Sequence, residues 1–325
     1  FPIPHSLFPI PHSLFPIPYS LFPIPHSPFP IPHSPFLIPY SPFPITYSPI
    51  MRSQWQNLLE NLGTWDGSFT QFSPLGILEK DTPTVVTLEG RNNNQTVYQT
   101  VQRFPPGETP PPMLELEYST LHRNILFFDN GAFSQGSAHY NPVATFGGEF
   151  GFIHQQRRLR FVILYQNGYL DQITLIREKL RGTTAPERPL LTVDQLLGTW
   201  EGEVVTLYPD LRPPDYTQSS LSVSREGNQI HQTLKSGDFS RTSTATLEGS
   251  RLEFSGGYQP VQVLLLPDGG STTSPVKLES GKPFFLEVGW LLSESDRLRL
   301  IRNYDRQGAW ESLSLVTERK TDSVL

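Results

Sequence analysis

The 325-residue chain contains no cysteine, which excludes disulfides, thiolate metal sites, iron–sulfur clusters and a cysteine nucleophile. Its net charge is −6 and its basic residues form no block, so no nucleic-acid partner is expected. No apolar run approaches the roughly 18 residues of a membrane-spanning helix, and the start of the chain has no secretory signal. These absences predict a soluble, cytoplasmic protein without a membrane span.

A proline-rich repeat fills the first 49 residues with seven copies of a seven-residue unit, Phe-Pro-Ile-Pro-His-Ser-Leu and its variants. Proline removes backbone donors and excludes helix and inner strand, so residues 1–50 are predicted to be disordered. The nucleotide repeat TTCCCCA encodes Phe-Pro-Ile-Pro-His-Ser-Pro, and every variant is one base away. We interpret the segment as a tandem DNA repeat read through as protein, with Met51 as the natural start. The alternatives are a proline-rich recognition tail or a histidine-bearing metal tract.

A tandem duplication follows Met51. The element Gly63-Thr64-Trp65-Asp66-Gly67 recurs 135 residues later as Gly198-Thr199-Trp200-Glu201-Gly202. Further matches run to the end of each copy, with offsets of 133–140 residues. We predict one domain over residues 51–182 and a second over 190–320, joined by a linker rich in proline and threonine.

Both copies show the alternation of apolar and polar residues that is typical of β-strands. Short helices are predicted only at Gln54–Leu62 and Val193–Leu197, and a long loop at Asp268–Lys282. Many short antiparallel strands in about 130 residues favour a closed barrel, because closure hides the sheet edges. The strands predicted in the first copy are Trp65–Phe72, Thr84–Gly90, Gln95–Phe104, Met113–Ser119, Arg123–Phe128, Ala132–Ala138, Phe146–His154, Arg158–Gln166 and Tyr169–Lys179.

A helical turn leading into Gly-x-Trp resembles the opening of lipocalins, in which the Trp closes one end of the barrel and a late-strand Arg packs over it. The resemblance assigns Trp65 and Trp200 to this structural role. It does not identify the Arg that packs over the Trp, because Arg177 has no matching Arg in the second copy. Function would then lie at the opposite end of the barrels, where Pro105–Pro112 and Asp268–Lys282 differ most between the copies.

The stretch from Met51 to about Lys320 also resembles the DUF3598 family, a mainly cyanobacterial two-domain family of uncharacterised function. More distantly it is similar to phycobiliprotein lyases of the CpcS/CpeS type, lipocalin-like chaperones that deliver a bilin to a cysteine of another protein. The heptanucleotide repeat is typical of the same organisms. The motifs that carry the DUF3598 resemblance are Leu62–Gly67, Arg103-Phe104, Phe127–Phe133, Arg158-Leu159-Arg160 and Thr174–Lys179. The expected fold is all-β, with two tandem lipocalin-like (calycin) antiparallel barrels.

A carboxylate and an Arg inside a barrel could hold the propionates and pyrrole nitrogens of a tetrapyrrole, and aromatic side chains could line its flat face. The alternatives are Glu–Arg pairs on an outer face and aromatic residues of an ordinary core. Isolated histidines suggest no metal site, and no catalytic motif is found. The tentative ligand-binding residues are Glu149, Arg160, Tyr165, Glu287, Trp290, Arg299 and Tyr304.

These residues are compatible with three functions. The first is a binding protein or chaperone for an apolar or tetrapyrrole-like molecule, with a bilin as the expected ligand and no cofactor required. The second is a bilin lyase with phycobiliprotein subunits as partners. The third is a structural or assembly protein whose barrels are filled by side chains, which the absence of a ligand-sized cavity would favour. We expect a binding protein rather than an enzyme.

Overall fold

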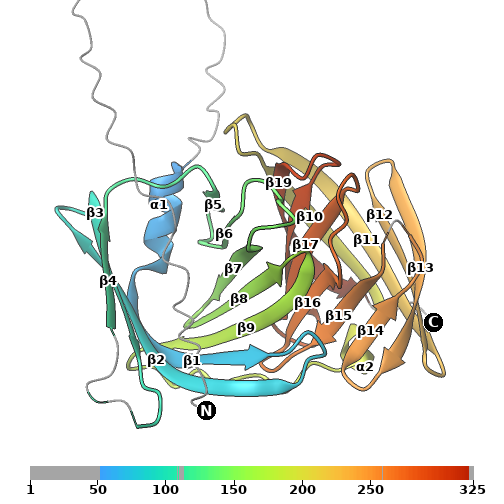
Figure 1. Ribbon diagram of the computed structural model, residues 1–325, viewed down its shortest axis with the longest axis horizontal. Coiled ribbons are helices and arrows are strands. Elements are labelled where there is room, and N and C mark those ends of the chain that lie inside the picture. Colours follow the sequence, from blue (N-terminus) through green and yellow to red (C-terminus); the bar gives the residue numbers. More distant parts are fainter. Residues whose placement is uncertain (1–51, 108, 110–112, 258, 322–325) are drawn as a thin grey trace, which may run out of the picture. The chain divides into compact units, whose positions relative to one another are not determined.

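The computed structural model describes residues 52–107, 109, 113–257 and 259–321, and these residues form mostly antiparallel β-strands (Figure 1). This confirms the predicted all-β class. The repeat of residues 1–50 lies outside the described residues. No helix in the described part of the chain is long and apolar enough to cross a membrane.

The first nine strands form one sheet in the order β4-β3-β2-β1-β9-β8-β7-β6-β5, called here the first sheet. Each strand overlaps one of the nine predicted segments, so the alternation pattern located all of them. The bounds are β1 Gly63–Phe72, β2 Leu78–Arg91, β3 Thr96–Arg103, β4 Met113–Tyr118, β5 Ile125–Phe127, β6 Phe133–Gly136, β7 Phe146–His154, β8 Arg157–Gln166 and β9 Tyr169–Leu180.

The first sheet curls without closing, because its end strands β4 and β5 do not pair with each other (Figure 1). A helical segment, α1 (Gln54–Leu58) followed by the 3₁₀ turn η1 (Leu59–Asn61), contacts both end strands. The Gln54 amide donates to the Phe127 carbonyl at 3.0 Å and accepts from the Phe127 N–H at 2.7 Å. Trp55 packs edge-on against Tyr118 of β4. The helix therefore lies where β4 and β5 would pair in a closed barrel.

The second copy forms a closed barrel in the order β10 to β19, called here the closed barrel. The closure predicted for both copies therefore holds in the second alone. The loop predicted at Asp268–Lys282 is wrong in part, since it contains β16, whose Ser and Thr residues pair with β15 and β17. The bounds are α2 Val193–Leu196, β10 Gly198–Leu207, β11 Asp215–Glu226, β12 Gln229–Ser236, β13 Phe239–Glu248, β14 Arg251–Phe254, β15 Val261–Leu265, β16 Gly270–Pro275, β17 Phe284–Leu291, β18 Asp296–Tyr304 and β19 Trp310–Thr321.

The largest hydrophobic core lies between the two sheets and takes side chains from both. On β8, Leu159 and Phe161 belong to this interface core, whereas Arg158 and Arg160 alternate with them and point to the concave face of the first sheet. On β18, Leu298 and Leu300 belong to the interface core in the same way. Two smaller clusters fill the concave face around one Trp and the barrel interior around the other.

Candidate functional site

A buried ion network lies on the concave face of the first sheet. Glu178 of β9 accepts hydrogen bonds from Arg158 at 2.7 and 3.0 Å and from Arg160 at 2.9 and 3.0 Å, both on β8. Arg160 also pairs with Glu149 of β7 at 2.6 Å. The Glu178 side chain is fully buried, and every bond runs between neighbouring strands. The network therefore ties β7, β8 and β9 together from the inside.

The closed barrel contains the same network at matching positions. Glu318 of β19 accepts from Arg297 at 2.7 Å and from Arg299 at 2.6 and 2.9 Å, both on β18. Arg299 reaches Glu287 of β17 at 3.3 Å. Four of the residues predicted to bind a ligand, Glu149, Arg160, Glu287 and Arg299, are thus members of these two networks.

Within each network, the attraction between opposite charges offsets the cost of burying them. Burial would raise the pKa of the Glu178 carboxyl, but Arg158 and Arg160 outweigh it and hold that pKa below its usual range. The pKa of Glu318 is lowered in the same way by its own two Arg partners. Neither carboxyl titrates near neutral pH, so the two networks are fixed ion clusters and are poorly suited to general acid–base catalysis.

Each network closes over the Trp of its own Gly-Thr-Trp element. The Trp65 indole donates to the Asn61 carbonyl at 3.0 Å, and the Arg158 guanidinium lies 4.6 Å from the ring centroid. In the closed barrel, Trp200 donates to the Leu196 carbonyl at 2.9 Å, and Arg297 lies 4.6 Å from its ring. The Arg over each Trp therefore comes from the Arg-Leu-Arg motif of the next-to-last strand, a repeated signal that the sequence interpretation did not use for this role.

The three aromatic residues of the predicted site lie on the opposite faces of their strands, in the interface core. Tyr165 donates to the Pro275 carbonyl at 2.6 Å, across the interface. Tyr304 donates to the Ser137 carbonyl at 2.9 Å, and Trp290 to the Asp268 carbonyl at 2.9 Å. Their polar atoms are already satisfied by backbone carbonyls. The predicted set is thus divided between two networks and one interface, and the structure does not bring it together as one site.

The interface core also contains a buried Arg that no sequence motif indicated. Arg302 is fully buried and has no carboxylate partner among the described residues. Its guanidinium lies 3.5 Å from the centroid of the Trp310 ring and donates to the Tyr304 hydroxyl at 2.7 Å. Longer bonds reach the Asn124 and Ser137 carbonyls of the first sheet. Burial lowers the pKa of Arg302, and its contacts link the two sheets.

The outer part of the concave face is less filled. Arg103 of β3 is half-buried and lies 5.4 Å from the centroid of the Phe69 ring, with no acidic partner in the described part of the chain. Burial lowers the pKa of Arg103. On this face the nearby edge strand β4 exposes Leu116, by 42%, whereas Met113, which is 54% exposed, lies on the opposite face of the strand. This face therefore combines an open sheet edge, apolar side chains and one uncompensated cation.

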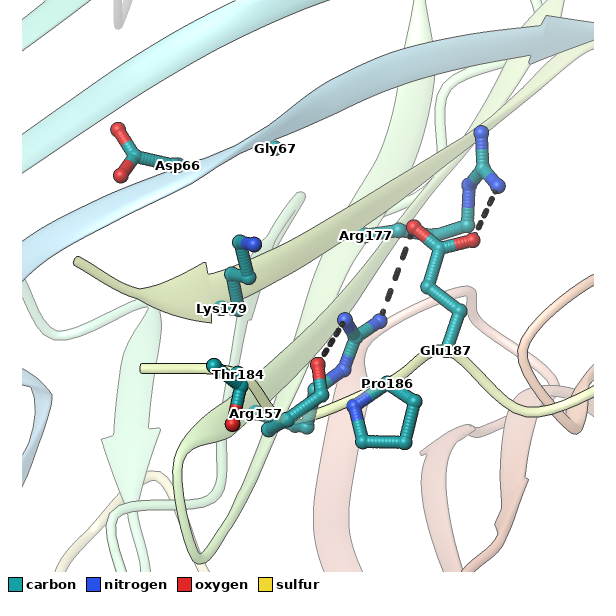
Figure 2. A pocket seen from close by; sticks show the side chains of 9 residues that line it. Asp66, Gly67, Arg157, Arg177, Lys179, Thr184, Pro186 and Glu187 are labelled. Carbon is teal, nitrogen blue, oxygen red and sulfur yellow. Dashed lines mark hydrogen bonds and ion pairs between the residues drawn. The ribbon is translucent and has the colours of Figure 1, made fainter. Parts of the chain in front are cut away.

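Two cavities are formed at the seam between the first sheet, the linker and the closed barrel. The first, of about 340 Å³, lies on the outer face of β1, β8 and β9, beneath linker residues Thr184–Glu187 (Figure 2). The second, of about 370 Å³, lies between β1 and the β14–β16 part of the closed barrel, and its lining is mainly apolar. Arg177 lines both. Neither cavity lies inside the closed barrel, and Pro105–Pro112, where function was predicted, falls partly outside the described residues.

No cluster of three His, Asp or Glu side chains that could hold a metal ion occurs in the ranges that the structure describes. The His rings found there contact single partners, such as Tyr140 for His139 and Thr244 for His231. Ser134 accepts a hydrogen bond from Arg302.

The fold and these sites define an all-β protein built from two tandem barrel-type sheets around a shared interface. The chain belongs to the DUF3598 family: a crystal structure of a family member of unknown function from Nostoc punctiforme is 46% identical, covers 83% of this chain and 100% of its own, and superposes with a TM-score of 0.79. The N-terminal DUF3598 domain, a domain of unknown function, matches residues 51–183. The C-terminal domain of the family described as biogenesis factor required for ATP synthase 1 matches residues 187–321.

More distant structures share less. The S-type phycobiliprotein lyase CPES from Guillardia theta is 12% identical, with a TM-score of 0.33 over 40% of this chain and 90% of its own. A putative outer membrane protein from Bacteroides fragilis is 13% identical, with a TM-score of 0.24 over 82% and 99% of the two chains. None of the curated proteins compared with the chain matches it.

Proposed function

We propose that this protein is an assembly factor that binds a subunit of a protein complex, the third of the functions that the sequence left open. The observation that carries the proposal is the packed core around Trp200 inside the closed barrel. Trp200, Arg297, Glu318 and the apolar cluster around them are buried against one another. A barrel of this kind is a rigid support, and binding then falls to its surfaces.

The match of residues 187–321 to a domain of an ATP synthase biogenesis factor supports the same proposal. It makes a subunit of ATP synthase the first partner to test. The match covers the second copy, which in this chain is the closed barrel. The first sheet is open, unlike the closed barrel, and we place partner binding there.

The edge strand β4 is the proposed docking element. Among the described residues it pairs with β3 alone, which leaves one side of its backbone to add a strand from a partner. Met113 and Leu116 are exposed on this strand, beside Glu115 and Glu117. Main-chain pairing would supply affinity, and these side chains would supply selectivity.

The test is a pull-down of purified ATP synthase subunits with the full chain. Charged residues on an edge strand oppose strand addition, so the double variant Met113→Lys and Leu116→Lys should lose the partner without loss of thermal stability. Val143→Lys, at a residue 82% exposed outside the strands, is the matched control. Capture that is equal in all three proteins, or capture by none of them, contradicts the proposal.

A second candidate function is favoured by Arg103. A half-buried guanidinium beside Phe69, with no acid nearby in the described chain, could pair with a propionate of a bilin lying on the concave face. Titration with phycocyanobilin should then shift its visible absorption band, and Arg103→Gln should abolish the shift. Covalent adduct on a co-expressed phycobiliprotein subunit would indicate the lyase function instead. Absence of both results removes this candidate.

A further inference from the structure

The strongest unassigned feature is the cationic cavity beneath the linker (Figure 2). Arg157, Arg177 and Lys179 bring three positive charges to it from neighbouring strands β8 and β9. Its acidic lining residues are Asp66 and Glu187. Asp66 is held by Arg181 at 2.6 Å and is therefore already paired outside the cationic group.

The donors of this cavity exceed the acceptors that the chain supplies. The Nε atoms of Arg157 and Arg177 are buried without a hydrogen-bond partner. Arg157 is more than nine-tenths buried, and its guanidinium is shared between Asp268 and the Ala185 carbonyl. Lys179 makes no ion pair in the described part of the chain. The cavity can therefore accept one more oxyanion.

Glu187 occupies the centre of this group as a resident carboxylate. It approaches Arg177 Nη1 at 2.7 Å and Arg157 Nη2 at 3.8 Å, so it lies between the two guanidinium groups (Figure 2). Its side chain is 42% exposed and comes from the linker, which no strand pairing holds at this point. Because the Glu187 carboxylate is partly exposed and belongs to the linker, a carboxylate from solution can replace it beside Arg177.

The second cavity adds an apolar wall next to this cationic group. Arg177 lines both cavities, and Thr70 and Asp81, which also contact Arg177, mark the boundary between them. Leu78 and Leu190 are 58% and 50% exposed at this second cavity. Its remaining apolar lining is Phe72, Leu265, Leu266 and Pro267. Covering such surface is favourable because it removes apolar side chains from water.

We propose that this seam is a binding site for an amphipathic carboxylate, whose head group displaces Glu187 from Arg177 and whose chain lies in the apolar cavity. Lys179 supplies the second charge for the head group. The linker then acts as a built-in competitor that occupies the site until the ligand arrives. The site is separate from the concave face and from β4, so it stands or falls independently of the proposed assembly function.

The experiment uses the full chain and decanoate, below its micelle concentration, in isothermal titration calorimetry. Decanoate should bind at a single site. Loss of one exposed charge pair should weaken binding roughly threefold to fivefold in Lys179→Gln, and removal of the competitor should tighten it by roughly the same factor in Glu187→Gln. Arg177→Gln should weaken it further, with thermal unfolding as the check that this variant is folded.

Control ligands and a control variant separate this site from others. Decyltrimethylammonium, with the same chain and the opposite charge, should not bind there, and acetate should bind far more weakly than decanoate. Arg212→Gln, at an exposed pair with Asp210 that lines neither cavity, should leave decanoate affinity unchanged. Absence of decanoate binding, or equal affinity in the original protein, Lys179→Gln and Glu187→Gln, would overturn the proposal.

Discussion

The first sheet and the closed barrel start from the same repeated elements and reach different ends. Both place a Trp beneath an Arg and tie the last strands together through a buried Glu with two Arg partners. The closed barrel pairs all its strands, whereas the first sheet leaves β4 and β5 apart and fills the gap with α1. Both copies thus have the same structural supports. The first sheet also has an accessible edge strand, which the closed barrel lacks.

The Trp residues give the largest expected effect, because large cavities in a packed core are costly. Trp65→Ala and Trp200→Ala should each lower the free energy of unfolding by about 3–5 kcal/mol. Equal losses would mean that the closing element works alike in the open and closed copies. Chemical denaturation measures both, with Tyr216→Ala at a residue 70% exposed as the control. A change near zero in either Trp variant would show that its Trp does not close the sheet.

The buried Glu residues give the next effect. Glu178→Gln and Glu318→Gln each leave two buried Arg side chains without their shared carboxylate, and each should cost about 3 kcal/mol, since glutamine retains some of the hydrogen bonds. Glu253→Gln removes an exposed partner of Arg251 and should cost less than about 1 kcal/mol. If Glu178→Gln lowers the free energy of unfolding as little as this control, the network of the open sheet is not equivalent to that of the closed barrel.

Acid should weaken both halves of the protein. The folded-state pKa values of Glu178 and Glu318 lie below the ordinary value of 4.5. Their stabilisation is therefore fully present above that pH and is lost as the pH falls through the folded values. Urea unfolding between pH 7 and pH 3 should show this fall, and it should be shallower in the Glu178→Gln and Glu318→Gln variants. Stability that stays constant on acidification would contradict the lowered pKa values.

The helix that fills the gap should give the smallest effect. Gln54→Ala removes two hydrogen bonds to Phe127 of β5 and should cost about 1–2 kcal/mol. Hydrogen exchange should accelerate at β5 and remain unchanged in the closed barrel, which has no comparable edge. The control is Gln166→Ala, whose exposed side chain forms hydrogen bonds with Thr145. Unchanged exchange at β5 would mean that the helix does not protect this edge.

Local sequence patterns predicted most of the elements of this fold. Strand alternation located β1 to β9, and the capping box of Ser53 and Gln56 begins the predicted helix. The turn between β8 and β9 contains Asn167 and Gly168, which have the positive φ angles that Asn and Gly tolerate. These features depend on neighbours in sequence, which is why they could be read without the structure.

The candidate site was harder to predict, because both faces of β8 and β18 are buried. An alternating pattern shows that Arg160 and Phe161 point in opposite directions, and it does not show which side is the barrel interior. Phe161 faces the other copy, so the apolar face is the interface and the charged face points inward. Arg302 lies on the apolar face of β18, and two of its partners, the Asn124 and Ser137 carbonyls, come from the first copy, so the alternating pattern of the strand did not indicate it.

The sequence alone determined the duplication, the strands and the paired Trp elements, because these follow from repeats and from periodicity along one chain. Tertiary structure decided whether each sheet closes, which faces of β8 and β18 meet, and where cavities remain. Those outcomes depend on contacts between residues more than 100 positions apart, such as Tyr165 with Pro275 and Arg157 with Asp268. A short stretch of sequence contains only one partner of each such contact, so it cannot show how much the contact stabilises the fold.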